Sequence, residues 1–368
     1  MNFERVLITP EAERHARAQH LLAGWPDLPV EKVSGLPEVQ DWLKRNYPDP
    51  IGQGKRTLLL DVFPGEFLKP CPCTTGHINC GYWILNPMLG CPFDCSYCLL
   101  QEYLGPSPIT VRLNWEDMLS EVSDYLTNRR ARSSLRSRSY FGGGGLDSRP
   151  DLPFRIGTGE LSDSLALEPW LGLAPALINF FAGQESAVFE LKTKSDRVEC
   201  LEGLDHRGKT VVAWSVNPEE MIAREEQGAA TLEERLRAAK RVAGWGYKVG
   251  FHFDPILDEP DAGEAYEEVV KKIFATVAPE QVAWISLGAL RFNPRLAPIV
   301  RERFPNSRIL LGEFITGLDG KLRYPRFIRQ PLLRRASSAI RQAAPQAWLY
   351  LCMETESVWQ EVLPLSVI

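Results

Sequence analysis

The chain has 368 residues, 44% of them hydrophobic and 24% charged, and its formal net charge is −5. This length suits one large α/β domain with appendages or two modest domains, and the acidic balance excludes an overall attraction to nucleic acid, so any such binding must come from local patches. No apolar run is long enough to cross a bilayer, and the start Met-Asn-Phe-Glu-Arg-Val lacks the apolar core of a signal peptide, so we expect a cytoplasmic protein without a membrane partner.

The first 80 residues predict a small α/β segment that ends in a connector rich in cysteine. Val6–Thr9 and Thr57–Phe63 have the apolar content of buried strands, and the stretch from Glu11 to Ala23 follows a proline and suits a helix. The connector runs over Lys69–Gly81. We place the first domain boundary after residue 80.

From residue 81 to residue 308, predicted strands and helices alternate. Such alternation implies right-handed crossovers and a parallel sheet, here a partial (β/α)6 barrel, in which chemistry takes place at the carboxyl ends of the strands. The predicted strands are Tyr82–Asn86, Phe154–Gly157, Ala187–Leu191, Thr210–Ser215, Tyr247–Phe253 and Val282–Leu287. The predicted helices are Trp115–Asn128, Pro169–Phe181, Leu232–Trp245, Gly263–Thr276 and Pro294–Phe304.

Residues 309–368 predict a C-terminal lobe made of a hairpin and a helix. Asp319-Gly320 is a strong turn signal for the hairpin, and Pro331–Ala343 suits the helix. Two further strands are predicted over Arg308–Leu311 and Leu349–Met353.

The first predicted barrel strand leads into the sequence Cys91-Pro-Phe-Asp-Cys95-Ser-Tyr97-Cys98. Three thiolates at this spacing can bind three irons of a [4Fe–4S] cluster and leave the fourth iron open, whereas a structural zinc site needs a fourth protein ligand. The loop, with Tyr97 before its third cysteine, resembles the motif of the radical SAM superfamily. That resemblance implies a reduced cluster that cleaves S-adenosylmethionine (SAM) to a 5′-deoxyadenosyl radical.

The second predicted strand ends in Gly157-Thr-Gly159-Glu160-Leu-Ser162-Asp163. The two glycines permit the backbone to approach a ligand closely, and a following carboxylate can accept hydrogen bonds from an ammonium. Radical SAM enzymes often carry a similar Gly-Gly-Glu-like segment here, and the resemblance implies that this one holds the SAM amino group. The alternative is a tight strand-to-helix turn with Ser162 or Asp163 as the N-cap.

Lys194 and Ser215 end the third and fourth predicted strands. Lys194 can pair with a carboxylate, and both residues lie where a barrel binds its cofactor. Taken alone, Lys194 is also explained as a solvated lysine and Ser215 as a turn serine.

These motifs together resemble spore photoproduct lyase, a radical SAM enzyme that repairs a methylene-linked pair of thymines in DNA by abstracting a hydrogen atom. The resemblance covers about residues 80 to 304 in the same order, with a weaker match in the C-terminal hairpin lobe. It implies that Ser162, Asp163, Lys194 and Ser215 contact SAM and that Arg291 lies near the substrate. The segments that carry it are Gly90–Gln101, Leu161–Asp163, Thr193-Lys194, Trp214–Asn217, Gly250-Phe251, Pro255-Ile256 and Leu290–Phe292.

Two positions depart from the lyase pattern. Glu160 stands where the lyase has its hydrogen-donating cysteine, and Leu99 stands where the lyase has a tyrosine of its radical relay. A carboxyl O–H bond is too strong to give a hydrogen atom to a thymine-type carbon radical. We therefore expect a different substrate or a different quenching route, with Cys80 or Cys352 as alternative hydrogen donors.

Further cysteines and two basic stretches leave alternatives open. Cys71, Cys73 and Cys80, with His77 or Cys352, can be read as ligands of an auxiliary metal or as buried, incidental cysteines. Residues 129–145 and 323–335 interleave arginine with aromatic residues, which suits contacts to nucleic acid but equally suits a solvated insertion and a charged hairpin.

The leading hypothesis is a radical SAM enzyme that abstracts hydrogen from a nucleic-acid-related substrate, with Tyr97, Glu160 and Arg291 at the reacting centre. Its expected cofactors are a [4Fe–4S] cluster and SAM, and its expected partners are DNA and an external electron donor such as flavodoxin or ferredoxin; we expect a monomer. One alternative is a radical SAM enzyme that acts on a peptide or small metabolite, because fold does not determine substrate. Another is a non-catalytic iron–sulfur protein, which would not need a SAM pocket.

Overall fold

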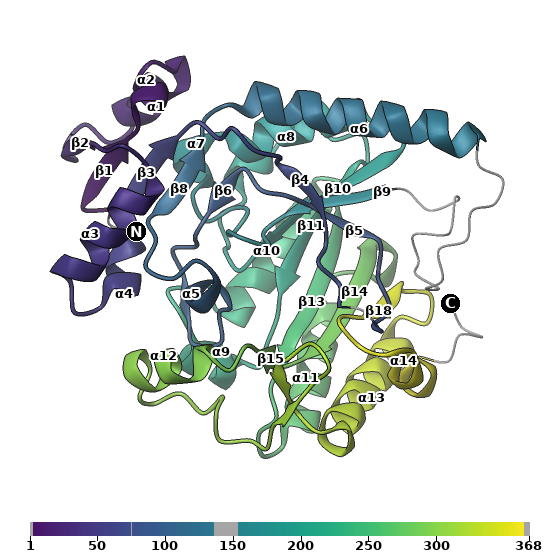
Figure 1. Ribbon diagram of the computed structural model, residues 1–368. Coiled ribbons are helices and arrows are strands. Elements are labelled where there is room, and N and C mark those ends of the chain that lie inside the picture. Colours follow the sequence, from purple (N-terminus) through teal and green to yellow (C-terminus); the bar gives the residue numbers. More distant parts are fainter. Residues whose placement is uncertain (1–2, 75, 136–153, 364–368) are drawn as a thin grey trace.

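The computed structural model describes residues 3–74, 76–135 and 154–363. Its main element is a curled eight-stranded sheet in the order β18-β14-β13-β11-β10-β9-β5-β4 (Figure 1). The strands from β18 to β5 are parallel, and β4 pairs antiparallel with β5 at one edge. The strands are β4 (Leu68–Pro70), β5 (Tyr82–Leu85), β9 (Phe154–Thr158), β10 (Ala187–Thr193), β11 (Thr210–Ser215), β13 (Lys248–Ile256), β14 (Val282–Ala289) and β18 (Leu349–Leu351).

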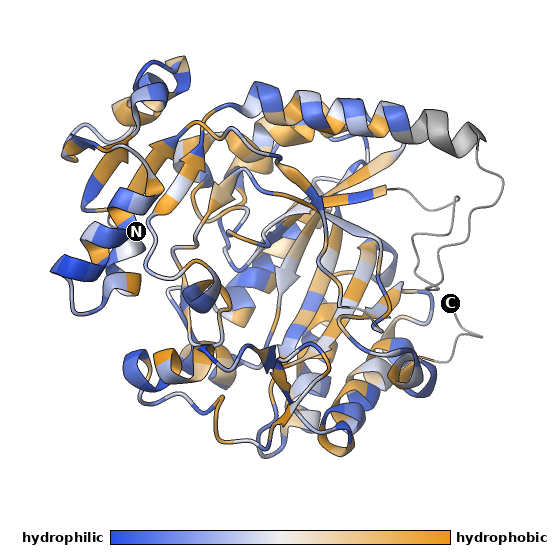
Figure 2. Ribbon diagram, viewed as in Figure 1, coloured by the Kyte–Doolittle hydropathy of each residue, from blue (hydrophilic) through white to orange (hydrophobic). Residues whose placement is uncertain are grey.

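Helices cover the outside of the curled sheet, and apolar residues concentrate on the strands between them (Figure 2). Strand β11 is the clearest apolar run, and all six of its residues are buried. A parallel strand with both faces covered needs apolar residues on both sides, so its sequence does not alternate. The helices are α6 (Trp115–Leu135), α7 (Glu168–Leu171), α8 (Leu173–Ala182), α9 (Glu219–Glu225), α10 (Leu232–Gly244), α11 (Ala262–Thr276) and α12 (Leu296–Arg303). The predicted alternation of strand and helix is confirmed. Within the described part of the chain, no helix combines the length and the apolar character needed to cross a membrane.

A second, five-stranded sheet lies at the N-terminal side of the molecule, in the order β2-β1-β3-β8-β6. It takes in β6 and β8, which lie beyond residue 80, so the N-terminal segment shares its sheet with chain that follows the connector. Leu7, Val39, Leu43 and Leu59 form a separate small core between this sheet and α3. The elements are β1 (Arg5–Ile8), α1 (Pro10–Glu13), α2 (Ala16–Ala23), β2 (Val30–Lys32), α3 (Leu36–Asn46), α4 (Pro50–Gly54), β3 (Thr57–Asp61), β6 (Met88–Leu89) and β8 (Ile109–Arg112).

Short elements complete the fold around the cysteine loop and the C-terminal lobe. The hairpin predicted around Asp319-Gly320 is confirmed by the pairing of β16 with β17, and β15 adds a third strand to it. The elements are β7 (Asp94–Cys95), α5 (Leu100–Tyr103), β12 (Glu226–Gln227), β15 (Arg291–Phe292), β16 (Ile315–Thr316), β17 (Leu322–Arg323), α13 (Arg326–Ala343) and α14 (Glu356–Val362).

Several predicted elements differ from the structure. The helix predicted over Pro169–Phe181 is divided into α7 and α8 at Gly172, which has a φ of +67°. The strand over Arg308–Leu311 is wrong: the segment is a turn, in which the Arg308 N–H donates to Glu225 and the Leu311 N–H donates to the Arg308 carbonyl. The helix over Glu11 to Ala23 is divided because the His15 side chain caps a new helix at Ala16. The helix predicted from Pro331 begins earlier, at Arg326, and contains the proline.

Candidate active site

The cysteine loop is anchored to the segment that follows strand β11. Strand β7 pairs antiparallel with β12, so that Cys95 lies opposite Glu226. The Ser96 N–H donates to the Glu225 carbonyl at 2.8 Å, and the Gln101 side chain donates to the Cys95 carbonyl at 2.9 Å. These bonds hold the predicted cluster ligands at a fixed place beside the carboxyl end of the barrel.

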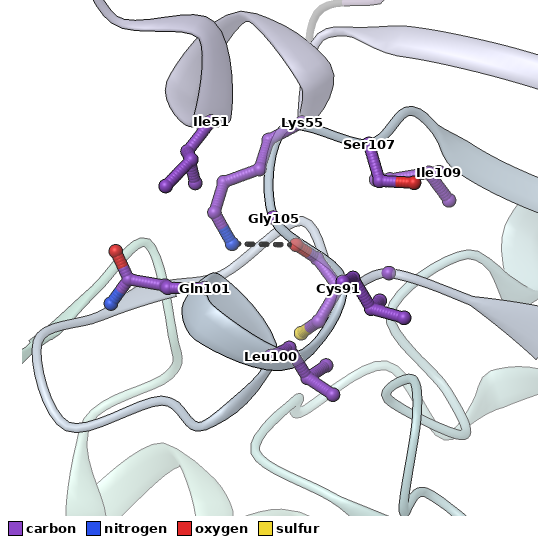
Figure 3. Close-up of a pocket in the computed structure, with 10 residues that line it drawn as sticks. Ile51, Lys55, Cys91, Leu100, Gln101, Gly105, Ser107 and Ile109 are labelled. Carbon is purple, nitrogen blue, oxygen red and sulfur yellow. Dashed lines mark hydrogen bonds between the residues drawn. The ribbon is translucent and has the colours of Figure 1, made fainter. Parts of the chain in front are cut away.

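A lysine of the N-terminal segment supports the loop from its other side. Lys55 donates from Nζ to the carbonyl oxygens of Cys91 at 3.0 Å and Phe93 at 2.7 Å, and its ammonium lies 3.7 Å from Asp94. Figure 3 shows the contact with Cys91 inside a small pocket that α4 and α5 help to line. A buried cation here favours thiolates on the loop.

The three thiols fit a [4Fe–4S] cluster better than a single metal ion. Cys95 is buried while Cys91 and Cys98 are partly buried, and burial, followed by the charge of Asp163, raises the pKa of Cys91 to about 12. Because burial disfavours the charged thiolate, such cysteines lose their protons at neutral pH only when bound irons supply positive charge. Among the residues that the structure describes, no three His, Cys, Asp or Glu side chains converge on one metal ion. A cluster, in contrast, takes each thiolate on a separate iron.

Asp163 ties the end of β9 to the end of β10. Its Oδ1 accepts from the N–H groups of Leu165 and Ala166 at 3.0 and 2.9 Å and from the Thr193 hydroxyl at 2.7 Å. Its Oδ2 accepts from the Lys194 N–H at 2.7 Å. The side chain therefore stabilises the turn after β9 and fixes the backbone that carries Lys194. It is not the N-cap of a helix, because α7 begins at Glu168 with Leu167 at its N-cap.

Gly157 and Gly159 are required by contacts inside the protein. A Cβ added to Gly157 would lie 1.7 Å from the Tyr82 hydroxyl oxygen, and one added to Gly159 would lie 2.7 Å from the Lys192 carbonyl oxygen. Gly159 also has a φ of +98°, which favours glycine. Packing thus explains both glycines, and their contact with SAM remains a prediction.

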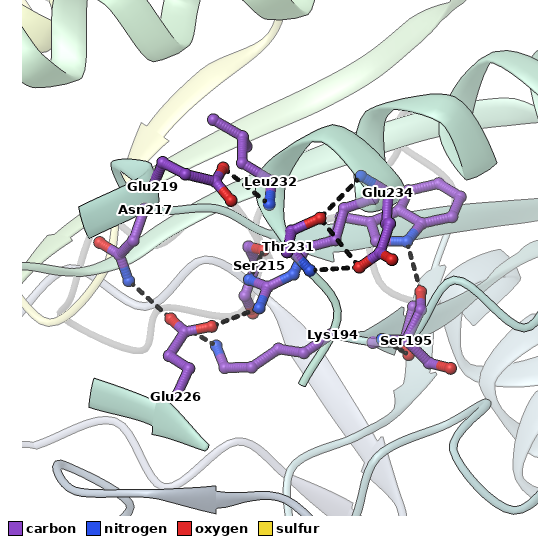
Figure 4. A network of polar contacts seen from close by, with 12 residues as sticks. Lys194, Ser195, Ser215, Asn217, Glu219, Glu226, Thr231, Leu232 and Glu234 are labelled. Carbon is purple, nitrogen blue, oxygen red and sulfur yellow. Dashed lines mark hydrogen bonds and ion pairs between the residues drawn. The ribbon is translucent and has the colours of Figure 1, made fainter. Parts of the chain in front are cut away.

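Glu226 is the centre of a buried polar network at this end of the barrel (Figure 4). Its carboxylate accepts from Tyr97, from Asn217 at 2.9 Å and from Arg235 at 2.5 Å, and Lys194 lies 3.7 Å away. Burial alone would raise the pKa of Glu226, but the cations of Lys194 and Arg235 lower it to about 2. The network therefore joins the predicted SAM lysine to the cysteine loop through one ionised carboxylate.

Ser215 and Ser162 lie near this network in the fold. Ser215 ends β11 and is buried, and its carbonyl accepts from Arg235 at 2.9 Å. Ser162 is also buried, directly before Asp163. The structure thus places the predicted SAM residues at neighbouring strand ends, as expected for a cofactor site in a barrel.

Arg291 belongs to a second polar group, on the far strands of the sheet. Its guanidinium binds Asp254 through two bonds of 2.9 and 3.2 Å and donates to the Cys352 sulfur at 3.1 Å. Burial raises the pKa of Asp254, but Arg291 outweighs burial and leaves it lowered. Cys352 directly follows β18, so a thiol, a carboxylate and an arginine meet at the carboxyl ends of three strands.

Glu160 and Lys192 extend this second group toward β9 and β10. Burial lowers the pKa of Lys192, but the charges of Asp254 and Glu160 outweigh it, so that the pKa is raised. Burial, and then the charge of Glu160, raises the pKa of Cys71 to about 12. We call the set Cys71, Glu160, Lys192, Asp254, Arg291 and Cys352 the chamber group.

Several residues of both groups were missed in the sequence. Glu226 lies in the two-residue strand β12 and Arg235 in helix α10, neither in a recognisable functional motif, and only the fold brings them to the cysteine loop. Asp254 directly follows the predicted strand Tyr247–Phe253, and a carboxylate at the carboxyl end of a barrel strand was a signal that could have been found. Buried charges in strands often mark functional sites.

The remaining predicted patches have partners within the protein. The arginines of residues 323–335 pair with carboxylates, which favours the charged-hairpin alternative; the pairs are Arg323 with Asp319, Arg326 with Glu361, Arg329 with Glu354, Arg334 with Glu361 and Arg335 with Glu264. His77 bonds to Arg323 at 3.0 Å, and no metal-binding trio in the described chain includes Cys71, Cys73 or Cys80. The first basic stretch lies mostly outside the described residues.

Comparison with known proteins gives one consistent answer. The family model described as spore photoproduct lyase matches residues 147–330. Spore photoproduct lyases of Clostridium acetobutylicum, Geobacillus sp. and Bacillus subtilis are 22%, 26% and 24% identical, and each alignment covers 83–84% of this chain and 84% of the relative. A solved spore photoproduct lyase complexed with dinucleoside spore photoproduct has a TM-score of 0.77 at 20% identity, over 95% of this chain and 99% of that one. A double mutant of the lyase with bound AdoMet and the same dinucleoside has a TM-score of 0.74 at 20% identity, over 95% and 98% of the two chains.

Proposed function

The chain belongs to the spore photoproduct lyase family and is a radical SAM enzyme with a [4Fe–4S] cluster, and from this premise we propose that it repairs a methylene-linked thymine pair in DNA. When bound and reduced, the cluster supplies the electron that cleaves SAM to methionine and a 5′-deoxyadenosyl radical. The residues described above must then hold SAM, receive the lesion and return a hydrogen atom to the product.

One observation carries the proposal: strand β10 links the two polar groups. Lys192 lies in β10 and Lys194 follows its last residue, so the alternation of the strand directs both side chains to the same side. Lys194 lies 3.7 Å from Glu226 beside the cysteine loop. The carboxylates of Asp254 and Glu160, in the chamber group, raise the pKa of Lys192. A radical formed at the first site therefore needs to act over only a short distance on a substrate held at the second.

In this proposal SAM lies over the ends of β9, β10 and β11. Lys194 binds the SAM carboxylate, Ser215 and Ser162 donate hydrogen bonds, and Asp163 acts by holding the backbone of Lys194. Charge-assisted bonds of this kind are shorter and stronger than neutral ones. Gly157 and Gly159 shape the turn beside which the SAM amino group lies.

The lesion enters the chamber group after it leaves the base stack. An enzyme that acts on a base inside a barrel has to rotate it out of the duplex. Arg291 and Lys192 provide positive charge for the phosphate or the carbonyl oxygens of the lesion, and Tyr97 closes the space toward the cluster loop.

Cys352 is the proposed hydrogen donor in place of the cysteine that Glu160 replaces. Its sulfur accepts a hydrogen bond from Arg291, the residue that the family resemblance places near the substrate. The S–H bond of Cys352 breaks as a C–H bond forms on the thymine radical, which leaves a thiyl radical. One electron from the external donor, a flavodoxin or ferredoxin, and one proton from water then restore the thiol.

The remaining expectations are part of the same proposal. We propose a monomer in the cytoplasm with three units, residues 1–80, 81–308 and 309–368. Because β8 pairs with β3 and β6 pairs with β8, the sheet of the first unit is completed by strands of the second, and we expect the first unit to depend on the second for folding.

The function is tested by anaerobic incubation of the reconstituted protein with SAM, a reductant and dinucleoside spore photoproduct. Both 5′-deoxyadenosine and the repaired dinucleotide should form. Formation of 5′-deoxyadenosine in the presence of the lesion but without repair would reject this substrate and favour a peptide or small metabolite. A protein that binds the cluster but never cleaves SAM would be the non-catalytic iron–sulfur protein.

A further inference from the structure

We propose that Glu226 is a positioning residue that sets the reduction potential of the cluster and fixes the place where Lys194 presents its ammonium to SAM. The inference rests on the proposed SAM site, because it assigns Lys194 to the SAM carboxylate. It adds a residue that lies in none of the motifs of the cluster or of SAM binding.

The first argument is the position of the carboxylate relative to the loop. The backbone of Glu226 pairs with that of Cys95, and its side chain accepts from the hydroxyl of Tyr97. The residue thus contacts the cysteine loop both through its backbone and through its side chain. A movement of Glu226 would move Cys95, and a loss of its charge would be felt by the neighbouring thiolate.

The second argument is the balance of charge inside the network. Arg235 is fully buried and is bound to Glu226 at 2.5 Å and to the Ser215 carbonyl at 2.9 Å, so its guanidinium has no freedom to turn toward a ligand. Lys194 is the second cation, and it lies farther away, at 3.7 Å, with a side chain that is 14% exposed. One carboxylate against two cations leaves one positive charge, and the SAM carboxylate supplies its counter-charge through Lys194.

The third argument is that the carboxylate is fixed in place from several sides. Asn217 donates to it at 2.9 Å, and Asn217 itself accepts from the Tyr266 hydroxyl at 2.7 Å. The orientation of Glu226 is therefore determined before SAM arrives. A preorganised carboxylate of this kind holds the lysine ready and costs no rearrangement on binding.

A buried negative charge beside a cluster stabilises its oxidised form, since reduction adds a further negative charge. Removing the charge of Glu226 should therefore raise the potential. The neighbouring Glu225 provides a matched control: it is equally buried and its carboxylate bonds to Ser96 of the same loop. It is paired with Arg224, however, and contacts neither Tyr97 nor Lys194 in the bonds described.

The experiment compares Glu226→Gln, Glu226→Asp and Glu225→Gln after anaerobic reconstitution, with the midpoint potential measured by spectroscopic titration without SAM. We expect Glu226→Gln to shift the one-electron equilibrium toward the reduced cluster by roughly tenfold, which corresponds to about 59 mV. Glu225→Gln should shift it by less than half as much. Equal potentials in the wild type and Glu226→Gln, or an equal shift in the two glutamine variants, would overturn the role in the potential.

The aspartate variant separates position from charge. It keeps the negative charge but is one methylene shorter, so it cannot reach Tyr97 and Lys194 together. We expect a potential close to that of the wild type and about tenfold weaker SAM binding, measured as the change in the EPR spectrum of the reduced cluster during SAM titration. Wild-type SAM affinity in Glu226→Asp would overturn the positioning role, even if Glu226→Gln fails to fold.

The two proposals fail in different ways. If no reconstituted wild-type protein changes its EPR spectrum with SAM, the proposed SAM site is wrong. If the wild type responds to SAM but the Glu226 variants behave like it, only the role of Glu226 is wrong.

Discussion

The two lysines at the end of β10 face environments that differ in how closely they follow the lyase pattern. Around Lys194, the residues that the family resemblance assigns to SAM are all present. Glu226 lies 3.7 Å from the lysine and is itself held by hydrogen bonds from Arg235 and Asn217. Around Lys192, the position of the family's hydrogen donor holds Glu160, whose charge acts on Lys192 itself. The proposed site of radical formation thus follows the family pattern, and the proposed substrate site does not.

This difference teaches that radical generation and radical quenching can be considered separately in this protein. The first requires a loop with three thiolates and a fixed cation for SAM, which depend on the backbone of β7, β9 and β10. The second requires only that a thiol lies within reach of the substrate, and several strand ends around the chamber group can supply one.

The largest effect is expected at the cysteine loop. Replacing Cys91, Cys95 and Cys98 together with alanine removes every thiolate of the open cluster, so the variant should bind no [4Fe–4S] cluster and cleave no SAM. Iron analysis and the amount of 5′-deoxyadenosine measure this directly, and Cys200→Ala is the matched control outside both polar groups. SAM cleavage by the triple variant would mean that the radical-generating site lies elsewhere.

The next largest effect is expected in the chamber group. Arg291→Met removes the cation bonded to Asp254, whose side chain is 16% exposed. Breaking such a largely buried pair from one side should cost about 3 kcal/mol of folding free energy, at the low end of the range for fully buried pairs. The double variant Arg291→Met/Asp254→Leu should recover part of this loss, because the carboxylate that lost its bonded cation is also removed, while Lys192 keeps Glu160 as a counter-charge. Chemical denaturation measures both values. An equally unstable double variant would show that the loss comes from packing and not from the charge.

A smaller effect is expected at the SAM residues. Lys194→Ala and Ser215→Ala should each weaken SAM binding by roughly 1.5–3 kcal/mol, the range for one hydrogen bond to a charged group, and leave the spectrum of the cluster nearly unchanged. Asp163→Ala should weaken binding as well, since it frees the backbone of Lys194. SAM titration followed by EPR gives the affinities. Unchanged affinity in both Lys194→Ala and Ser215→Ala would reject the assignment taken from the family.

The sequence predicts the barrel and the cysteine loop because both depend on local patterns. Strand β11 is a mainly apolar run, β9 and β10 are short segments with clear ends, and three cysteines within one loop need no tertiary information. Glu226 could not be predicted, because its partners Tyr97 and Arg235 are far away in the chain or on another element and only the pairing of β7 with β12 brings them together. The sharing of β6 and β8 with the N-terminal sheet has the same cause, since sheet pairing between distant strands leaves no periodic signal.

The smallest and most specific effect concerns the fate of the thymine radical. If Cys352 is the hydrogen donor, Cys352→Ala should still cleave SAM and open the lesion at nearly the wild-type rate, but it should convert the clean dinucleotide into adducts with the reductant. A carbon radical without a nearby thiol persists until it meets another reagent, whereas the carboxyl group of Glu160 cannot quench it. Product analysis by mass spectrometry after incubation in deuterated buffer would follow the exchangeable hydrogen of the thiol into the product.

Combining Cys352→Ala with Glu160→Cys tests whether the position of the family donor still faces the substrate. The double variant should restore clean repair, because the new thiol lies where the lyase has its own cysteine and next to Lys192 in the chamber group. Cys71→Ala and Cys80→Ala serve as controls that remove other thiols near this site. Clean repair by Cys352→Ala alone, together with its loss in Cys71→Ala or Cys80→Ala, would transfer the donor role to that residue, and the barrel would still quench the radical with a thiol from outside β9.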